Sequence, residues 1–389
     1  MNFSLYFHIP FCVHRCAYCD FNTYAGQESL IPGYVEALCR EIEMVARSAP
    51  ERLPAHTVFF GGGTPSLLSA TQFESILGKV RNSFELAPDA EMSLEANPGT
   101  LTKDFLQDLH SLGFNRLSLG VQSTHPDELR QLERIHNYHQ GIEAVTWARQ
   151  AGFDNLNLDL IFGLPEQTLE RWQATVKLIL GLRPEHLSLY ALTIEPGTPF
   201  GRWAQRGIIS VPDPDTAADM YEWAGEALET AGFEQYEISN WARPGRQCRH
   251  NLQTWRGQPY FGFGAGAHGC AGGMRIANVS RIKTYLERLH PDQLFSGRHF
   301  PLSPATVEQT NISRRVEMQE TMLTGLRLTR EGVSAEVFAD RFGVPMRDVF
   351  GREIDELTGL SLLEWVGPVL RLTKRGRLLG NQVFLRFVD

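Results

Sequence analysis

The sequence lacks three features that would place it in a common class of protein. No apolar run approaches the roughly 20 residues that span a bilayer. The N-terminus lacks the basic and then apolar pattern of a signal peptide. Basic residues are outnumbered, 37 Lys and Arg against 45 Asp and Glu, whereas binding to a phosphate backbone needs a basic face. We therefore expect a cytoplasmic protein without a transmembrane segment or a nucleic-acid partner; peripheral contact with a membrane stays open.

Cysteine is also scarce, with six in 389 residues. A disulfide framework is disfavoured because the chain is long and carries no secretory signal. The second Cys-x2-Cys pair that zinc knuckles usually need does not occur in the sequence. Cys39, Cys248 and Cys270 stand alone, and we expect them to be small buried residues.

The other three cysteines, Cys12, Cys16 and Cys19, fall within eight residues directly after a strand-like run. Three thiolates on one short loop can bind three irons of a [4Fe–4S] cluster. The fourth iron is then open to chelation by the amine and carboxylate of another molecule. A zinc site completed by His8 or His14 is the alternative that these residues leave open.

From residue 3 to about residue 193, short apolar runs alternate with amphipathic segments in which apolar residues recur at intervals of three and four. This alternation predicts an α/β fold with βα units around a parallel sheet. Six strands fit a partial (β/α)6 barrel better than a complete eightfold one. The expected strands are Ser4–Ile9, Thr57–Phe60, Glu91–Ala96, Arg116–Val121, Asn155–Ile161 and His186–Leu192, and the expected helices are Tyr34–Val45, Thr71–Phe84, Lys103–Leu112, Tyr138–Ala151 and Leu169–Leu182.

Polar or glycine-rich residues follow five of these strands, where barrels of this kind carry their working residues. They are the cysteine loop, Gly61–Gly63, Glu95, Gln122 and Asp159. Glycines let a ligand approach the backbone, and carboxylates accept hydrogen bonds from an ammonium or a ribose. The ordinary alternatives are a tight turn for the glycines and helix capping for the acids. Gln122, together with Arg134, can orient a substrate or a carboxylate.

The second half of the chain predicts two further regions, with boundaries that give three domains: 1–240, 241–300 and 301–389. The middle region contains His250-Asn251, Trp255 and the glycine-rich run 262–269, which either bind a flat ligand or form an ordinary loop. Beyond Pro301, helical patterns and a hairpin-like Leu362–Leu372 indicate a small, mostly helical domain of winged-helix character.

Five motifs of this chain together resemble one known group of proteins. They are Tyr-x-His-Ile-Pro-Phe-Cys-x3-Cys-x-Tyr-Cys, Gly-Gly-Gly-Thr-Pro-Ser, Glu-x-Asn-Pro, Gly-Val-Gln-Ser and Asp-Leu-Ile-Phe-Gly-Leu-Pro. The chain resembles the radical S-adenosylmethionine (SAM) superfamily, in its oxygen-independent coproporphyrinogen III oxidase-like branch, and is most similar to the HemW-type haem chaperones.

The resemblance implies cofactors and site residues for this chain. Cys12, Cys16 and Cys19 would bind a [4Fe–4S] cluster, and a side chain at Gly63 would block SAM while leaving the iron in place. His250 would ligate haem. The positions that would contact SAM are Tyr6, Tyr18, Gly62, Gly63, Thr64, Glu95, Gln122, Arg134, Asp159 and Ala191.

Two departures bear on the activity that the resemblance implies. Phe21 stands where the dehydrogenases of this branch have a fourth cysteine, which argues against decarboxylation of a porphyrinogen. Thr254 replaces the tyrosine of the chaperones' His-Asn-x-x-Tyr-Trp motif, which weakens any stacking or hydrogen bond that the tyrosine ring supplies to haem. We therefore expect a SAM-binding haem chaperone, monomeric or dimeric, with haem-acceptor proteins of respiration and an electron donor as partners. The alternatives are an oxygen-independent coproporphyrinogen III dehydrogenase and a tRNA-modifying radical SAM enzyme.

Overall fold

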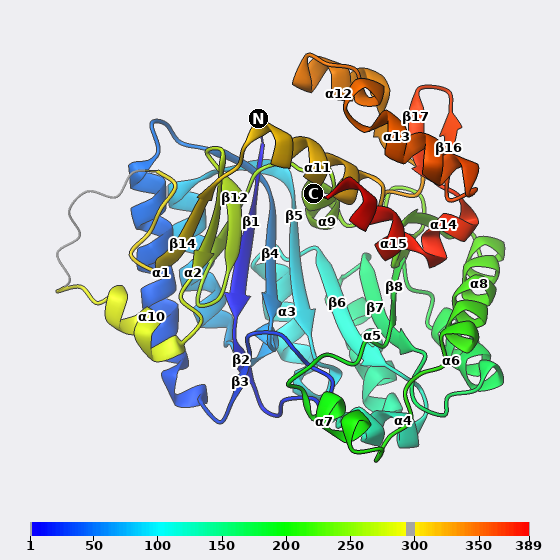
Figure 1. The fold of residues 1–389 in the computed structure, drawn as a ribbon. Helices are drawn as coiled ribbons and strands as arrows, with labels where there is room; N and C mark the ends of the chain where they lie inside the picture. The colour runs from blue at the N-terminus through cyan, green and yellow to red at the C-terminus, as the bar shows by residue number, and fades with distance from the viewer. Residues whose placement is uncertain (1, 293–299, 389) are drawn as a thin grey trace. The chain divides into compact units, whose positions relative to one another are not determined.

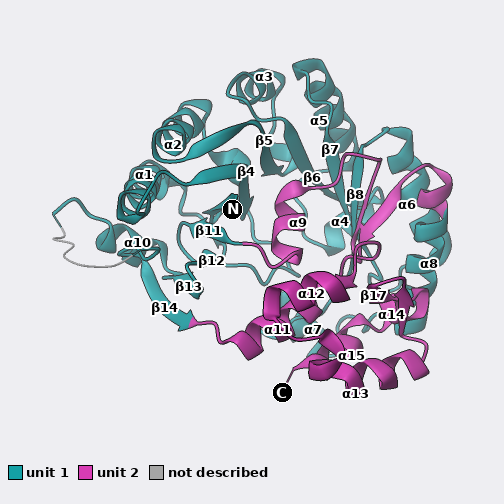
Figure 2. Ribbon diagram, turned by 90° about the horizontal axis from the view of Figure 1, so that it is seen from above, with its two compact units in different colours: residues 1–226, 259–310 teal, residues 227–258, 311–389 magenta. Residues whose placement is uncertain are grey.

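A computed structural model describes residues 2–292 and 300–388, which form two compact units. The first unit contains residues 1–226 and 259–310, and the second contains residues 227–258 and 311–389 (Figure 2). Residues 227–258, which the sequence analysis divided between a barrel and a connecting region, are thus part of the second unit.

Six parallel strands form the centre of the first unit, in the predicted order (Figure 1). They are β1 Phe3–Ile9, β4 Pro54–Gly62, β5 Glu85–Ala96, β6 Arg116–Gln122, β7 Leu156–Phe162 and β8 His186–Ala191. Their apolar runs are buried, with Phe7 stacked between Phe60 and Phe263 at ring-centroid distances of 4.8 and 5.3 Å. The predicted strands are confirmed, but β4 and β5 begin earlier because Pro54 pairs with Glu85 and Ala55 with Leu86 ahead of an irregular register.

The crossover helices lie along the outer side of these strands (Figure 2). They are α1 Ile31–Ser48, α2 Ala70–Ser83, α3 Lys103–Ser111, α5 Tyr138–Ala151 and α6 Leu169–Gly181. Local sequence sets where they begin: Ser69 with Gln72, and Asn137 with Gln140, form capping boxes at α2 and α5. Thr102 and Thr168 accept hydrogen bonds from the first turns of α3 and α6. Two short helices, α4 Pro126–Gln131 and α7 Pro199–Gln205, follow the ends of β6 and β8.

The sheet continues on the other side of β1 with residues from the second half of the chain. The strand β11 (Tyr260–Phe263) pairs in parallel with β1, and the order then runs β12 (His268–Ala271), β13 (Met274–Asn278) and β14 (Thr306–Asn311). The helix α10 (Ile282–Arg288) follows β13, and the short strands β2 (Phe11–Cys12) and β3 (Tyr24–Ala25) pair beside the cysteine loop.

The glycine-rich run 262–269 therefore belongs to the sheet, and its glycines permit close packing. A Cβ at Gly266, whose φ is 78°, would lie 2.3 Å from Asn22 Nδ2. The Asn22 amide donates to the carbonyls of Ala265 and Ser280 at 3.1 and 3.0 Å. The run thus holds the chain just after the third cysteine. The sequence alone left binding of a flat ligand possible for these glycines, and in the structure they serve close packing.

The second unit combines helices with strands that pair in antiparallel fashion. Its helices are α9 Arg249–Trp255, α11 Arg314–Gly325, α12 Ala335–Phe342, α13 Met346–Gly359, α14 Lys374–Leu378 and α15 Gly380–Phe384, and α8 Pro214–Thr230 spans the boundary between the units. Its strands are β9 Glu234–Glu237 paired with β10 Asn240–Ala242, and β15 Val333–Ser334, β17 Val369–Leu372 and β16 Leu363–Val366 in that order. Helices around a three-stranded sheet agree with the winged-helix character expected beyond Pro301.

Two apolar clusters explain why residues 227–258 belong to this unit. Tyr236, Ala242 and Leu252 pack with Leu328, and the Thr329 N–H donates to the Tyr236 carbonyl at 3.1 Å. The larger cluster includes Met322, Phe338, Phe350 and Leu370, and Ile238 of residues 227–258 packs against it.

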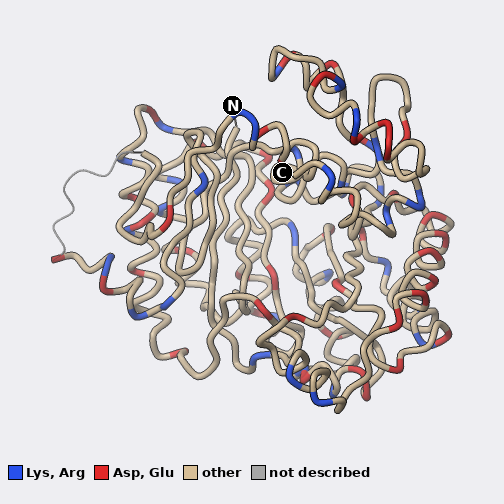
Figure 3. The backbone as a smooth tube through the Cα atoms, viewed as in Figure 1, with Lys and Arg blue, Asp and Glu red and all other residues tan. Residues whose placement is uncertain are grey.

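Charges of both signs are mixed along the second unit (Figure 3). On α13, which would be the recognition helix of a DNA-binding winged helix, Arg347 and Arg352 stand among four acidic residues. Among the residues that the structure describes, no helix is both long enough and apolar enough to cross a membrane.

Candidate functional site

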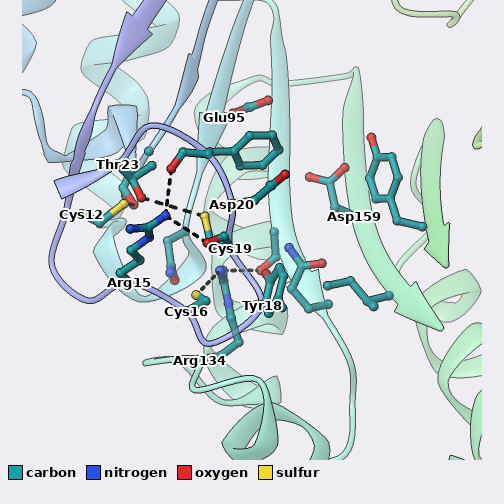
Figure 4. Close-up of a pocket in the computed structure, with 18 of the residues that line it drawn as sticks. Cys12, Arg15, Cys16, Tyr18, Cys19, Asp20, Thr23, Glu95, Arg134 and Asp159 are labelled. Carbon is teal, nitrogen blue, oxygen red and sulfur yellow. Dashed lines mark hydrogen bonds between the residues drawn. The ribbon is translucent and has the colours of Figure 1, made fainter. Parts of the chain in front are cut away.

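A cavity of about 390 Å³ opens at the carboxyl ends of the parallel strands of the first unit (Figure 4). All three clustered cysteines line it, as do nine of the ten residues expected to contact SAM. These nine are Tyr18, Gly62, Gly63, Thr64, Glu95, Gln122, Arg134, Asp159 and Ala191. Tyr6 does not line the cavity, and His250 is in the second unit.

The cysteine loop is held by hydrogen bonds of its own backbone and of Arg15. The Cys19 N–H donates to the Cys16 carbonyl at 3.1 Å, and Arg15 Nη2 donates to the carbonyls of Cys19 and Phe21 at 3.2 and 3.3 Å. None of the three cysteines is in a disulfide. Burial raises the pKa of the Cys12 and Cys19 thiols, opposed at Cys12 by a hydrogen bond from the Thr64 hydroxyl at 3.6 Å. A metal centre would offset the free-energy cost of deprotonating these buried thiols, because thiols that ligate metals lose their proton.

The glycine loop after β4 packs directly against the cysteine loop. The Gly63 N–H donates to the Ile9 carbonyl at 2.9 Å, and the Thr64 N–H donates to the Phe11 carbonyl at 2.8 Å. A Cβ at Gly63 would lie 2.6 Å from the Phe11 oxygen and 3.1 Å from Cys12 Sγ. Gly62, at φ 108°, leaves no room for a Cβ beside the His8 ring. Only a bare backbone fits here, so the glycines serve the cysteine loop as well as the cavity.

Tyr6 lies behind the site and supports it through a chain of hydrogen bonds. Because the Asn22 carbonyl can only accept, His8 Nε2 donates to it at 2.9 Å, and the Tyr6 hydroxyl donates to His8 Nδ1 at 2.9 Å. Burial lowers the pKa of His8 and thereby favours this neutral form. Tyr6 therefore reaches the cysteine loop through His8 and does not face the cavity.

Two carboxylates, Glu95 and Asp159, face the same cavity from neighbouring parts of the sheet. Burial and the charge of Asp159 raise the pKa of Glu95 to about 7, although the Gly62 N–H donates to Glu95 Oε2 at 3.1 Å. Asp159 accepts from Ser118 Oγ at 2.9 Å and from Asn157 Nδ2 at 2.8 Å. Burial raises its pKa too, opposed by these bonds. Such acceptors suit the hydroxyl and ammonium groups of a ligand.

Gln122 lines the cavity and has a buried side-chain oxygen without a hydrogen-bond partner among the described residues. Its backbone adopts a φ of 66°, which is uncommon for a residue with a side chain. Within the described part of the chain, Gln122 Oε1 is buried without a hydrogen-bond partner. A buried acceptor of this kind costs free energy unless a ligand supplies a donor, so the site is built to receive one.

Phe21 and Tyr190 line the outer part of the cavity. Their exposed fractions are 64% and 43%, which is high for aromatic side chains. In the sequence, Phe21 stood out only as a departure from a family pattern, and Tyr190 did not stand out at all. The signal for Tyr190 was its place at the end of β8, next to Ala191.

The residues present fit a cluster and a SAM molecule. Three thiols, a bare-backbone glycine loop, two carboxylates and Gln122 line one cavity. Within the described residues, no three His, Cys, Asp or Glu side chains are grouped so that they could hold one metal ion. A cubane cluster does not require such convergence, because each of its irons takes a separate thiolate.

Comparisons with known proteins agree with this geometry. A family model described as "Radical SAM superfamily" matches residues 6–179, and one described as "HemN C-terminal domain" matches residues 312–379. Proteins named "Heme chaperone HemW" from Bacillus subtilis (strain 168) and Escherichia coli (strain K12) are 38% and 37% identical over 387 and 386 residues. The alignments cover 99% of this chain in both cases, and 99% and 98% of those relatives.

One solved structure shares the fold over nearly the whole chain. It is described as "Coproporphyrinogen III oxidase (HemN) from Escherichia coli is a Radical SAM enzyme." and matches with a TM-score of 0.84 at 24% identity. The match covers 99% of this chain and 90% of that one. The fold and the three-cysteine site define the class: this is a protein of the radical SAM superfamily, which implies a [4Fe–4S] cluster and SAM. Within that superfamily, the chain belongs to the family of the HemW haem chaperones.

His250 occupies the first turn of α9 in the second unit and is 7% exposed. Trp255, at the other end of the same helix, packs under the guanidinium of Arg327 at 4.4 Å. Arg327 also pairs with the buried Glu237. The His-Asn-x-x-x-Trp segment is thus a packed helix in which His250 is buried.

Proposed function

We propose that this chain is a cytoplasmic haem chaperone that binds a [4Fe–4S] cluster, SAM and haem, and that it delivers haem to acceptor proteins. The observation that carries the proposal is similarity along the whole chain to proteins named "Heme chaperone HemW". An electron donor and haem-accepting respiratory proteins would be its partners.

In this proposal, Cys12, Cys16 and Cys19 ligate the cluster, and the cavity beside them holds SAM. When bound, the cluster can supply one electron to the SAM sulfonium. The chain's own residues bind and orient: Glu95 and Asp159 accept hydrogen bonds from ligand hydroxyls or ammonium, and Gln122 Oε1 gains the donor that it lacks. Thr64, Tyr18 and Ala191 complete the walls of the cavity.

Haem binds in the second unit, with His250 as the iron ligand. His250 is the single histidine among residues 227–258 and 311–389, so this unit offers one imidazole to an iron. Thr254 replaces the tyrosine of the chaperone motif. Apolar contact between this segment and haem therefore comes from neighbouring rings such as Trp255.

The rival function is oxidative decarboxylation of coproporphyrinogen III. It is favoured by the residues in the cavity lining that are expected to contact SAM. Phe21 argues against it, because a largely exposed phenyl ring stands where the dehydrogenases have a cysteine. The similarity to a coproporphyrinogen III oxidase structure concerns the fold alone.

One anaerobic experiment separates the two functions. The reconstituted, reduced protein is incubated with SAM and coproporphyrinogen III, and porphyrin products are measured by mass spectrometry. A parallel sample is loaded with haem and mixed with an apo-haem protein, and transfer is followed by the acceptor's absorbance. We expect haem transfer and no decarboxylated product. Decarboxylated product, or haem that never leaves a loaded protein, would reject the chaperone function.

A further inference from the structure

The segment after β6 folds back onto the end of that strand. Arg134 Nη2 donates to the Gly120 carbonyl at 2.8 Å, and His136 Nε2 donates to the Val121 carbonyl at 3.1 Å. The Ser123 hydroxyl donates to the buried carboxylate of Glu128 on α4. Gly120, Val121 and Ser123, the last two being the neighbours of Gln122, are therefore held by residues 128–136.

The same segment contacts the cysteine loop. Arg134 Nη1 donates to Cys16 Sγ at 3.4 Å (Figure 4), and the guanidinium also bonds to the Tyr18 hydroxyl. The preceding residue, Glu133, has a φ of 54° and accepts from His14 Nε2 at 3.4 Å. One turn thus touches the loop at His14, Cys16 and Tyr18.

The backbone around the Arg134 guanidinium leaves room for it and directs it to its position. A Cβ at Gly120 would lie 3.2 Å from Arg134 Nη2 and 2.9 Å from Gln122 Nε2, so glycine gives both side chains their room. The unusual φ of Glu133 directs the chain at the point where Arg134 turns to the cavity. Arg134 is only partly exposed, and in this setting its charge is weakly screened.

We propose that Arg134 is a positioning residue that donates a charge-assisted hydrogen bond to the Cys16 thiolate and so sets the reduction potential of the cluster. Hydrogen bonds to the sulfurs and nearby charge tune the potentials of iron–sulfur clusters. Reduction adds one negative charge to the cluster, and a cation 3.4 Å from a ligand sulfur stabilises the reduced form more than the oxidised form. This role goes beyond contact with SAM, and it rests on the proposed ligation of the cluster by Cys16.

The test is a redox titration of the reconstituted full-length protein without SAM, with dithionite as the one-electron donor and EPR as the readout. In Arg134→Gln we expect the ratio of reduced to oxidised cluster at a fixed potential to fall about tenfold, equivalent to a midpoint ~59 mV lower for one electron. Arg134→Lys keeps the charge but loses the planar fork of donors, so its midpoint should lie between those of Arg134→Gln and the wild type. The control is Arg130→Gln, which removes an exposed arginine from α4 and should leave the midpoint unchanged.

Iron and sulfide content of the wild type is measured first and tests cluster ligation independently of Arg134. An Arg134→Gln midpoint equal to or above that of the wild type overturns the proposal, as does an equal drop in Arg130→Gln. Where Arg134→Gln retains no cluster, Arg134→Lys decides: a lowered midpoint supports the hydrogen bond to Cys16, and an unchanged one rejects it.

Discussion

Gly63 is the residue at which the cluster loop and the SAM cavity meet. The sequence analysis expected a side chain there to block SAM and spare the iron. A Cβ at Gly63 would lie 2.8 and 2.6 Å from the carbonyl oxygens of Ile9 and Phe11 and 3.1 Å from Cys12 Sγ, so a side chain would displace the cysteine loop itself.

We therefore predict that Gly63→Ala loses most of its iron and sulfide after anaerobic reconstitution, together with SAM binding. The cause is the 2.6 Å approach of the new Cβ to the Phe11 oxygen, which neither loop can relieve by rotating a side chain. The control is Gly78→Ala on α2, where a Cβ meets nothing within 4 Å and full loading is expected. A Gly63→Ala protein with normal iron content but no SAM binding would restore the sequence-based expectation.

Glu95 should make stability depend on pH. Its pKa in the folded protein, about 7, lies above the ordinary 4.5, because burial and Asp159 disfavour its charged form. The folded protein thus keeps a proton that the unfolded chain releases, so the free energy of unfolding falls as pH rises between these two values. Glu95→Gln removes this dependence and keeps an oxygen that can accept from the Gly62 N–H.

We expect the stability of cluster-free Glu95→Gln relative to wild type to grow by roughly 1–3 kcal/mol between about pH 4.5 and about pH 8. Urea unfolding followed by circular dichroism measures this difference. Parallel stability curves for the two proteins would show that Glu95 titrates normally.

At the scale of secondary-structure elements, Glu41 joins α1 to the far end of the sheet. Its buried carboxylate accepts from the Gly264 N–H, Asn278 Nδ2, the Tyr285 hydroxyl and Ser303 Oγ, at 2.7–2.8 Å. Gly264 lies next to Ala265, whose carbonyl holds Asn22 behind the third cysteine. The network thereby anchors the segment that supports the cysteine loop.

Glu41→Gln should cost about 2–4 kcal/mol in the free energy of unfolding, because its amide turns donors toward groups that are themselves donors. The matched control is Glu43→Gln on the same helix, whose partly exposed ion pairs with Arg47 and Lys79 should contribute less than about 1 kcal/mol. Chemical denaturation of both variants measures the contrast. Equal costs would mean that the buried network adds nothing beyond a surface charge.

Elements with local signals could be predicted from the sequence, and those made by distant partners could not. Cysteine spacing, short apolar runs and apolar residues at intervals of three and four are signals within a few residues, and they located the cysteine loop, the six strands and the five crossover helices. The carbonyls that accept from the Asn22 side-chain NH2 group are 243 and 258 residues away, so no pattern near Asn22 indicated this role. The place of Tyr6 behind His8 likewise depends on a carbonyl at Asn22, which no pattern in β1 reveals.

At the scale of the whole molecule, the proposed cluster ligands and the proposed haem ligand fall in separate compact units. The three cysteines belong to the first unit and His250 to the second. Because the cysteine loop is held by contacts within its own unit, loss of the His250 imidazole should leave the cluster intact. Because His250 is buried, we expect haem binding at this residue to require a local opening of α9.

We predict that His250→Ala weakens haem binding at least about tenfold, as expected for loss of an iron ligand, while iron and sulfide content stays at the wild-type level. Absorbance titration with haem and cluster analysis on the same preparation measure both quantities. The control is His139→Ala, which removes an exposed imidazole from α5 and should change neither. Because His250 is buried, wild-type haem binding should also be slower than diffusion and should accelerate under conditions that loosen α9, such as low urea. Unchanged haem affinity in His250→Ala would remove this histidine as the ligand and direct the search to imidazoles of the first unit.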